Sequence, residues 1–184
     1  TEMDFLKYSV DRVVRSMHKD SVDPIPEYIR KMPTNETPNY IFQNLGDGSF
    51  QKKNSDWGFS EKGVSAGAAY ADLDNDGDLD LVINNTNDFA AIYKNNNETV
   101  NKNNFLRLQL DGGSANQRGI GTKVRLFCKG EQFYQEQSPV RGFQSSADPV
   151  LNFGVGKNTV IDSLLIIWPN DQFQKLVSVK PNQT

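Results

Sequence analysis

The feature that most constrains this chain is a run of acidic residues near its middle. Five aspartates alternate with other residues in one short segment, Asp72-Leu73-Asp74-Asn75-Asp76-Gly77-Asp78-Leu79-Asp80. Two like charges ~4 Å apart repel by roughly 1 kcal/mol even in bulk water, and by more near a protein surface. A turn that crowds so many carboxylates together is therefore costly unless a cation neutralises them. This cost disfavours the alternative interpretation, a solvated acidic turn.

The spacing of the aspartates fits calcium. This hard cation takes about six to eight oxygen ligands, and a tight loop supplies them from alternate positions. The expected ligands are the side-chain oxygens of Asp72, Asp74, Asp76 and Asp80, the last one closing the loop, and the backbone carbonyl of Asp78. Gly77 allows the sharp turn with which the loop would wrap around the ion. Magnesium fits less well, because it retains several waters and uses fewer carboxylates.

The flanks of the acidic loop exclude an EF-hand. That motif needs a bidentate glutamate at the last position of its loop, which here is Ile83, and a helix on each side. Instead, both flanking segments are short and strand-like, AGAAYAD (66–72) and LDLVINN (79–85). The loop is therefore expected to join two β-strands.

Outside the loop, the pattern changes from helix to strand along the chain. Leu6, Val10, Val13 and Met17 recur at helical spacing, and a second short helix is expected at 26–32. From residue 39 on, short apolar or alternating runs separated by polar turns indicate strands. These runs are NYIFQN, AAIYKN, FLRLQLD, TKVRLFC, EQFYQEQ, LNFGVG, SLLIIWP and DQFQKLVSV. The continuous apolar run SLLIIWP is expected to be buried on both faces.

A polar run, NNNETVNKNN (95–104), is the expected boundary between two β segments. The predicted organisation is thus a helical segment at 1–38, a partial blade with the calcium loop at 39–100, and a second all-β domain at 104–184.

Composition removes several classes of function. Cys128 is the single cysteine and His18 the single histidine. The chain therefore lacks the residues that histidine-based zinc sites need, and a catalytic triad could draw on one histidine only. Cys128 lies in an alternating apolar run and is expected to be a buried structural thiol. The net charge of −3 and the lack of a basic stripe argue against nucleic acid. No apolar run approaches the roughly 18 residues that a membrane-spanning helix needs.

Two stretches of the chain resemble known families. The segment SAGAAYADLDNDGDLDLVINNTNDFAAIYKN is similar to an FG-GAP/VCBS repeat, the calcium-binding blade of integrin-type β-propellers, and NYIFQNLGDGSF resembles the end of a preceding blade. From Asn104 on, the chain resembles the ASPIC/UnbV domain, with RGIG, FGVG and WPND as its recognisable marks. Together they are similar to the C-terminal end of cartilage acidic protein-like chains and their bacterial relatives.

The resemblance implies a mainly β fold. A helical segment would precede a partial β-propeller of about one and a half blades, followed by a small sandwich-like β domain. A whole propeller usually has about four to eight blades. The chain is therefore expected to be the C-terminal fragment of a longer bacterial surface protein.

The function that this resemblance implies is a non-enzymatic interaction module, secreted, periplasmic or on the outer-membrane surface. Its expected partners are a protein or glycan ligand, or the remaining blades and subunits of a larger assembly. One alternative is an accessory subunit of an outer-membrane uptake complex. A second is a carbohydrate-active enzyme with paired carboxylates. Against the enzyme, the dense carboxylates are those of the calcium loop, and Glu131 and Glu136 are expected on a strand surface.

Overall fold

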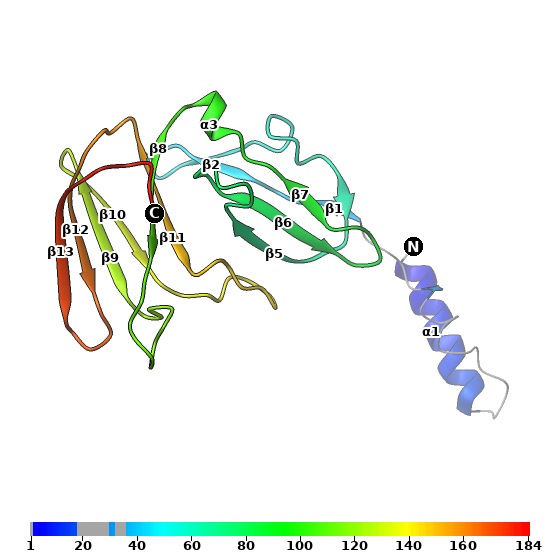
Figure 1. Cartoon of the computed structure of the whole chain (residues 1–184). Helices are drawn as coiled ribbons and strands as arrows, with labels where there is room; N and C mark the ends of the chain where they lie inside the picture. The colour runs from blue at the N-terminus through cyan, green and yellow to red at the C-terminus, as the bar shows by residue number, and fades with distance from the viewer. Residues whose placement is uncertain (1, 18–29, 32–35) are drawn as a thin grey trace. The chain divides into compact units, whose positions relative to one another are not determined.

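The computed structural model describes residues 2–17, 30–31 and 36–184 (Figure 1). The fold is mainly β, with an N-terminal helix and several small antiparallel sheets, as the sequence predicts. The chain divides into two compact units, Thr1–Val64 and Ser65–Thr184. The segment bounds expected from the sequence, with their boundary in the polar run, stay a prediction. Among the described residues, no helix combines the length and the apolar character that crossing a bilayer requires.

The first unit begins with helix α1, Glu2–Met17, which confirms the helical periodicity of the sequence. Its apolar stripe is solvent-exposed, since Leu6, Val10, Val13 and Met17 each keep more than half of their surface accessible. His18 and most of the second helix expected at 26–32 lie outside the described residues.

Among its described residues, the first unit also contains two small antiparallel strand pairs. Strand β1, Thr37–Pro38, pairs with β4, Lys62–Gly63, and β2, Phe42–Asn44, pairs with β3, Phe50–Lys52. The segment NYIFQNLGDGSF therefore forms a hairpin. Gly46 and Gly48 in its turn have positive φ angles of 84° and 86°, a conformation that glycine adopts without strain.

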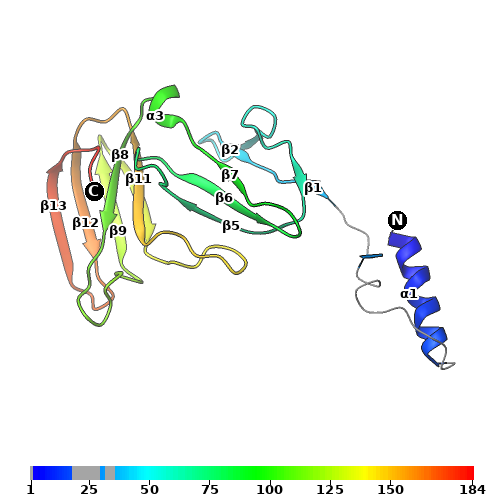
Figure 2. The same ribbon diagram turned by 45° about the vertical axis from the view of Figure 1, so that its right-hand side comes forward.

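The second unit opens with a three-stranded antiparallel sheet in the order β5-β6-β7 (Figure 2). Its strands are β5, Ser65–Ala71, β6, Asp80–Asn85, and β7, Ala91–Tyr93. All three were expected from the sequence, and the acidic loop joins the first two. A short helix, α3, Asn97–Val100, follows inside the run that the sequence suggested as a linker.

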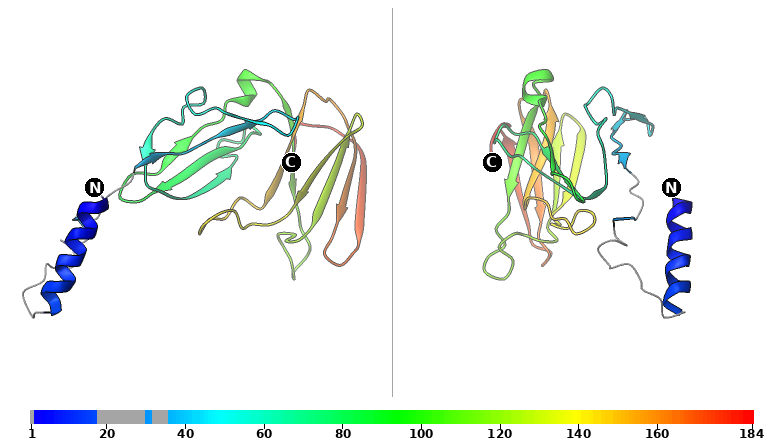
Figure 3. Two further views of the ribbon diagram at one scale, coloured as in Figure 1. Left: turned by 180° about the vertical axis from the view of Figure 1, so that it is seen from behind. Right: turned by 90° about the vertical axis from the view of Figure 1, so that its right-hand side faces the viewer.

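The rest of the second unit is a small sandwich of two antiparallel sheets (Figure 3). One sheet has the order β10-β9-β12-β13, and the other pairs β11 with β8. The strands are β8, Asn104–Gln109, β9, Lys123–Cys128, β10, Glu131–Glu136, β11, Val150–Gly156, β12, Ile161–Ile167, and β13, Phe173–Val179. Each lies where an alternating or apolar run predicted it.

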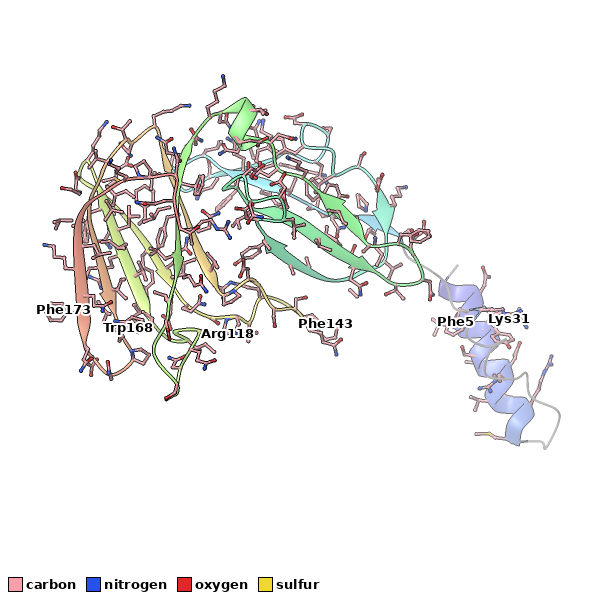
Figure 4. The ribbon with its side chains drawn as sticks, in the orientation of Figure 1. Phe5, Lys31, Arg118, Phe143, Trp168 and Phe173 are labelled. Atoms are coloured by element: carbon pink, nitrogen blue, oxygen red, sulfur yellow. The ribbon has the colours of Figure 1, made fainter. Side chains whose placement is uncertain are left out.

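Apolar side chains from β8, β9, β11 and β12 form one core between the two sheets. Cys128 is fully buried in it, which confirms the expected structural thiol. Leu164 and Ile166 of β12 face the core, but Leu165 between them is only half-buried. Burial of this strand on both faces was thus overestimated, because the second face of its sheet is partly open to solvent. Figure 4 shows Phe173 of β13 pointing away from the core, and its side chain is exposed.

Candidate metal centre

The acidic loop turns back on itself between β5 and β6 with the help of two residues in the left-handed region. Asn75 has a φ of 62° and Gly77 a φ of 96°. Gly77 also lies against an aromatic ring, because a Cβ atom there would be only 1.9 Å from Cε1 of Phe105. Glycine is therefore required at this position for two reasons, the backbone angle and the close approach of the ring.

Backbone hydrogen bonds inside the loop orient the first carboxylates. The Oδ1 of Asp72 accepts the N–H of Asp76 at 3.1 Å, and its Oδ2 accepts the N–H of Gly77 at 3.0 Å. The Oδ1 of Asp76 accepts the N–H of Asp78 at 3.1 Å. These bonds wind the loop around its own carboxylates, as a cation-binding turn requires.

Asp80 closes the loop from the other side. Its Oδ2 accepts the N–H of Leu73 at 3.0 Å, and its Oδ1 accepts the N–H of Asn95, just after β7, at 2.9 Å. The residue is 3% exposed. A carboxylate has about four lone-pair sites, so these two bonds leave Asp80 capacity for an ion.

The carboxylates gather in two groups that share one member. Ligand oxygens of Asp72, Asp74 and Asp76 lie within 4.8 Å of one another, and so do those of Asp76, Asp78 and Glu98 of α3. Calcium holds its oxygens at about 2.3–2.6 Å, so two ligands of one ion lie at most about 5 Å apart. Each group therefore has the dimensions of part of a calcium coordination shell.

Several oxygens of these groups are buried without a hydrogen-bond donor. In the part of the chain that the structure describes, they are Oδ2 of Asp76, Oδ1 of Asp78 and Oε2 of Glu98. A buried acceptor left unpaired costs about 1–3 kcal/mol, and more when it is charged. These ligands are all hard oxygens, and a calcium ion near them would satisfy the unpaired acceptors together.

Two basic side chains touch the site from outside the loop. Nη1 of Arg107 lies 2.7 Å from Oδ2 of Asp72, and only 14% and 1% of the two side chains are exposed. Nζ of Lys94 donates to Oδ2 of Asp74 and lies 3.5 Å from Oδ2 of Asp76. These two cations face six carboxylates, the five of the loop and that of Glu98, so the site keeps a strong negative charge.

The pKa values follow this uneven distribution of partners. Burial, reinforced by the charge of Asp76, raises the pKa of Asp78 to about 6. The hydrogen bond from Lys94 instead lowers the pKa of Asp74, and the same contact raises the pKa of Lys94. An anion disfavoured by burial is stabilised by a nearby positive charge. A cation close to Asp78 would therefore favour its charged form.

The loop is docked on the β8–β11 sheet within the second unit. Besides the ion pair of Arg107 from β8, the Nδ2 of Asn152 from β11 donates to the carbonyl of Gly77 at 3.0 Å. The ring of Phe105, also from β8, covers Gly77. The loop is therefore held by the sandwich as well as by its own strands.

The structure brings together four of the five aspartates predicted from the sequence. Asp72, Asp74, Asp76 and Asp78 fall in the two acidic groups, whereas Asp80 lies outside both and is bonded to the backbone. The side chain of Asp78, and not only its carbonyl, points into a group. The ligand set predicted for calcium stays a prediction.

Three residues of the candidate site were not predicted from the sequence. Glu98 lies in the polar run at 95–104, and no spacing rule connects it to the loop. Lys94 and Arg107 are polar residues within the runs AAIYKN and FLRLQLD. The only signal for them was electrostatic, since a strongly acidic loop favours basic neighbours.

Comparison with known families gives two matches along the chain. Residues 29–83 match the FG-GAP-like repeat, which covers the acidic loop and ends inside β6. Residues 112–184 match the ASPIC and UnbV family, which covers β9 to β13. No curated protein matches the chain. The chain therefore contains an FG-GAP-like repeat, which implies a propeller blade, followed by an ASPIC/UnbV domain.

Proposed function

We propose that this chain is a calcium-binding, non-enzymatic interaction module that works outside the cytoplasm. The observation that carries the proposal is the set of buried carboxylate oxygens without hydrogen-bond donors at the loop. Calcium in the loop would satisfy the oxygen of Asp76, place positive charge beside those of Asp78 and Glu98, and offset the mutual repulsion of the aspartates. The proposed ligands are side-chain oxygens of Asp72, Asp74, Asp76 and Asp80 and the carbonyl of Asp78.

The extracytoplasmic setting is inferred from the affinity that such a loop needs. Calcium sites of extracellular modules have dissociation constants on the order of 10⁻⁴–10⁻³ M, which match the calcium concentration of that environment. Here Arg107 and Lys94 already neutralise part of the loop charge and would compete with the ion. A moderate affinity of this kind supports a module filled where calcium is abundant.

A cavity of about 310 Å³ in the second unit supports the binding of a polar ligand. Its lining includes Tyr70 from β5, Glu136 from β10 and Arg141 and Asp148 from the loop before β11. The Nε of Arg141 donates to the hydroxyl of Tyr70 at 2.7 Å. An aromatic ring beside polar groups suits a glycan or a protein ligand, the two kinds of ligand that the resemblance suggests.

The same cavity favours one second candidate. Glu136 and Asp148 are two carboxylates on its lining, as a carbohydrate-active enzyme would require. Turnover on a panel of glycans that disappears in Glu136→Gln would support that enzyme. Binding without turnover, kept in Glu136→Gln, would support the non-enzymatic module.

The calcium proposal is tested by titration calorimetry. We expect the wild-type chain to bind calcium in the micromolar to millimolar range, and magnesium more weakly. Asp76→Asn should weaken calcium binding at least about tenfold, because it removes a charge shared by both acidic groups. The matched control is Asp88→Asn, an exposed aspartate outside the loop whose Oδ1 acceptor asparagine retains. Wild-type protein that releases or takes up no heat up to millimolar calcium would refute the proposal.

A further inference from the structure

We propose that Asp76, Asp78 and Glu98 form a second divalent-cation position beside the one expected within the loop. Glu98 would be a ligand from outside the loop, and Asp76 would bridge the two ions. This inference rests on the proposed calcium function and extends it from one ion to two.

The geometry separates the two positions. In each group, one ligand oxygen of every residue lies within 4.8 Å of the others, but Asp78 and Glu98 do not join Asp72 and Asp74 in a single group. The ligands of one calcium ion lie within about 5 Å of each other. One ion therefore has no place from which to reach every carboxylate, whereas two ions that share Asp76 do. A bridging carboxylate of this kind is common where two metal ions lie side by side.

The burial of Asp78 points directly to a ligand. This residue is 8% exposed, and its Oδ1 is enclosed without a hydrogen-bond partner. Its Oδ2 accepts the N–H of Glu98 at 3.3 Å, which fixes α3 next to the loop. The Oε2 of Glu98 is also enclosed and unpartnered, although the side chain as a whole is 28% exposed. Two buried anionic oxygens without a hydrogen-bond donor are costly, and a cation beside them would lower that cost.

The basic side chains leave this second group under-compensated. Arg107 pairs with Asp72 and Lys94 with Asp74, so each commits its closest contact to the first group. Toward the second group, Nζ of Lys94 is 3.5 Å from Asp76 and 4.0 Å from Glu98. Three carboxylates at these distances retain a net negative charge. They would bind a divalent cation that prefers oxygen ligands. Calcium is the cation to use as the probe.

Because Glu98 is partly exposed, water can reach this position and supply the remaining ligands. Three carboxylates supply about three to six oxygens, depending on whether they bind through one oxygen or two. Water would complete the shell from the open side of α3. This composition predicts that the second ion exchanges more readily than an ion enclosed by the loop.

The test is the number of calcium ions bound by the whole chain. We would count them by equilibrium dialysis with atomic emission and by native mass spectrometry at saturating calcium. The wild-type chain should bind two equivalents, and Glu98→Gln should bind one. Glu98→Asp, which keeps the charge but shortens the side chain, should bind the second equivalent at least about tenfold more weakly. The matched control, Glu131→Gln on the exposed face of β10, should bind two.

The outcomes separate this inference from the function on which it rests. A wild-type chain that binds one equivalent, or Glu98→Gln that still binds two with unchanged affinity, would overturn the second position and leave the calcium function intact. A wild-type chain that binds no calcium would overturn both. Circular dichroism of each variant, matched to wild type, confirms that lost equivalents do not reflect unfolding.

Discussion

The ion pair between Arg107 and Asp72 should be worth several kcal/mol of stability. It lies almost entirely out of solvent, with 14% and 1% of the two side chains exposed and an N–O distance of 2.7 Å. Removing one partner of such a pair leaves an uncompensated buried charge and costs about 3–5 kcal/mol. Asp72 retains two backbone donors, from Asp76 and Gly77, so the lower end applies. We therefore expect Arg107→Met to cost about 3 kcal/mol.

Thermal and urea unfolding of the full chain in EDTA would measure this cost. For a unit of this size, 1 kcal/mol corresponds to a shift in Tm of roughly 4 °C, so the variant should melt about 12 °C lower. The matched control is Arg125→Met, because Arg125 of β9 is exposed. This substitution should change stability by about 0.5 kcal/mol or less. Asp72→Asn combined with Arg107→Met should recover part of the loss, because no charge is then left unpaired.

Calcium gives the same variant a second readout. At about a hundredfold excess over Kd, calcium bound as proposed would stabilise the wild type by roughly 2.7 kcal/mol. If the ion contacts Asp72, it should stabilise Arg107→Met by more, since it then neutralises an otherwise unpaired carboxylate. The reasoning fails if Arg107→Met costs less than about 1 kcal/mol or behaves like the Arg125 control.

Three further outcomes are expected. Chelation with EDTA should reduce hydrogen-exchange protection in β5 to β7 and also in β8 and β11, because the loop is docked on that sheet; loss confined to 66–95 would show that the docking contacts carry little energy. Gly77→Ala should destabilise the chain by about 2–4 kcal/mol through overlap with Phe105 and its φ of 96°, measured by urea unfolding. Its control, Gly113→Ala, has open space around the new methyl group and should cost about 1 kcal/mol. Burial, with the charge of Asp162, raises the pKa of Cys128, so a thiol reagent at pH 8 should label native protein at least about a hundredfold more slowly than urea-unfolded protein; equal rates would contradict its burial.

The sequence predicted the strands of the second unit well because their signal is local. Period-two alternation over six or seven residues and glycine-containing turns are enough to place β9 or β11. The strands that were missed, β1, β3 and β4, have only two or three residues each, which is too short for a period to show. For the same reason the sequence does not predict the four-residue helix α3, which lies inside the polar run at 95–104.

The candidate site was predictable only where its parts are consecutive. The aspartates of the loop can be recognised from their spacing in the sequence. Glu98, in contrast, reaches the loop only because α3 folds back onto Asp78. Arg107 meets Asp72 only because the sandwich packs against the blade loop. Such contacts between positions far apart in the chain depend on tertiary structure, which a repeat of residue types does not encode. The sequence therefore predicted the acidic loop but not the neighbours that contact it.

The contact between Lys94 and Asp74 has a kinetic consequence. An ammonium group tethered to β7 acts as a counter-ion that the chain carries with it. A newly made chain in surroundings poor in calcium would have this charge available at once, so the loop could close before any metal arrived. Calcium entry would then be an exchange, in which the lysine swings out to solvent as the ion takes its place, rather than a folding event. Loading would be limited by a side-chain rotation and the dehydration of the ion, and the chain would recover its closed loop each time calcium became scarce.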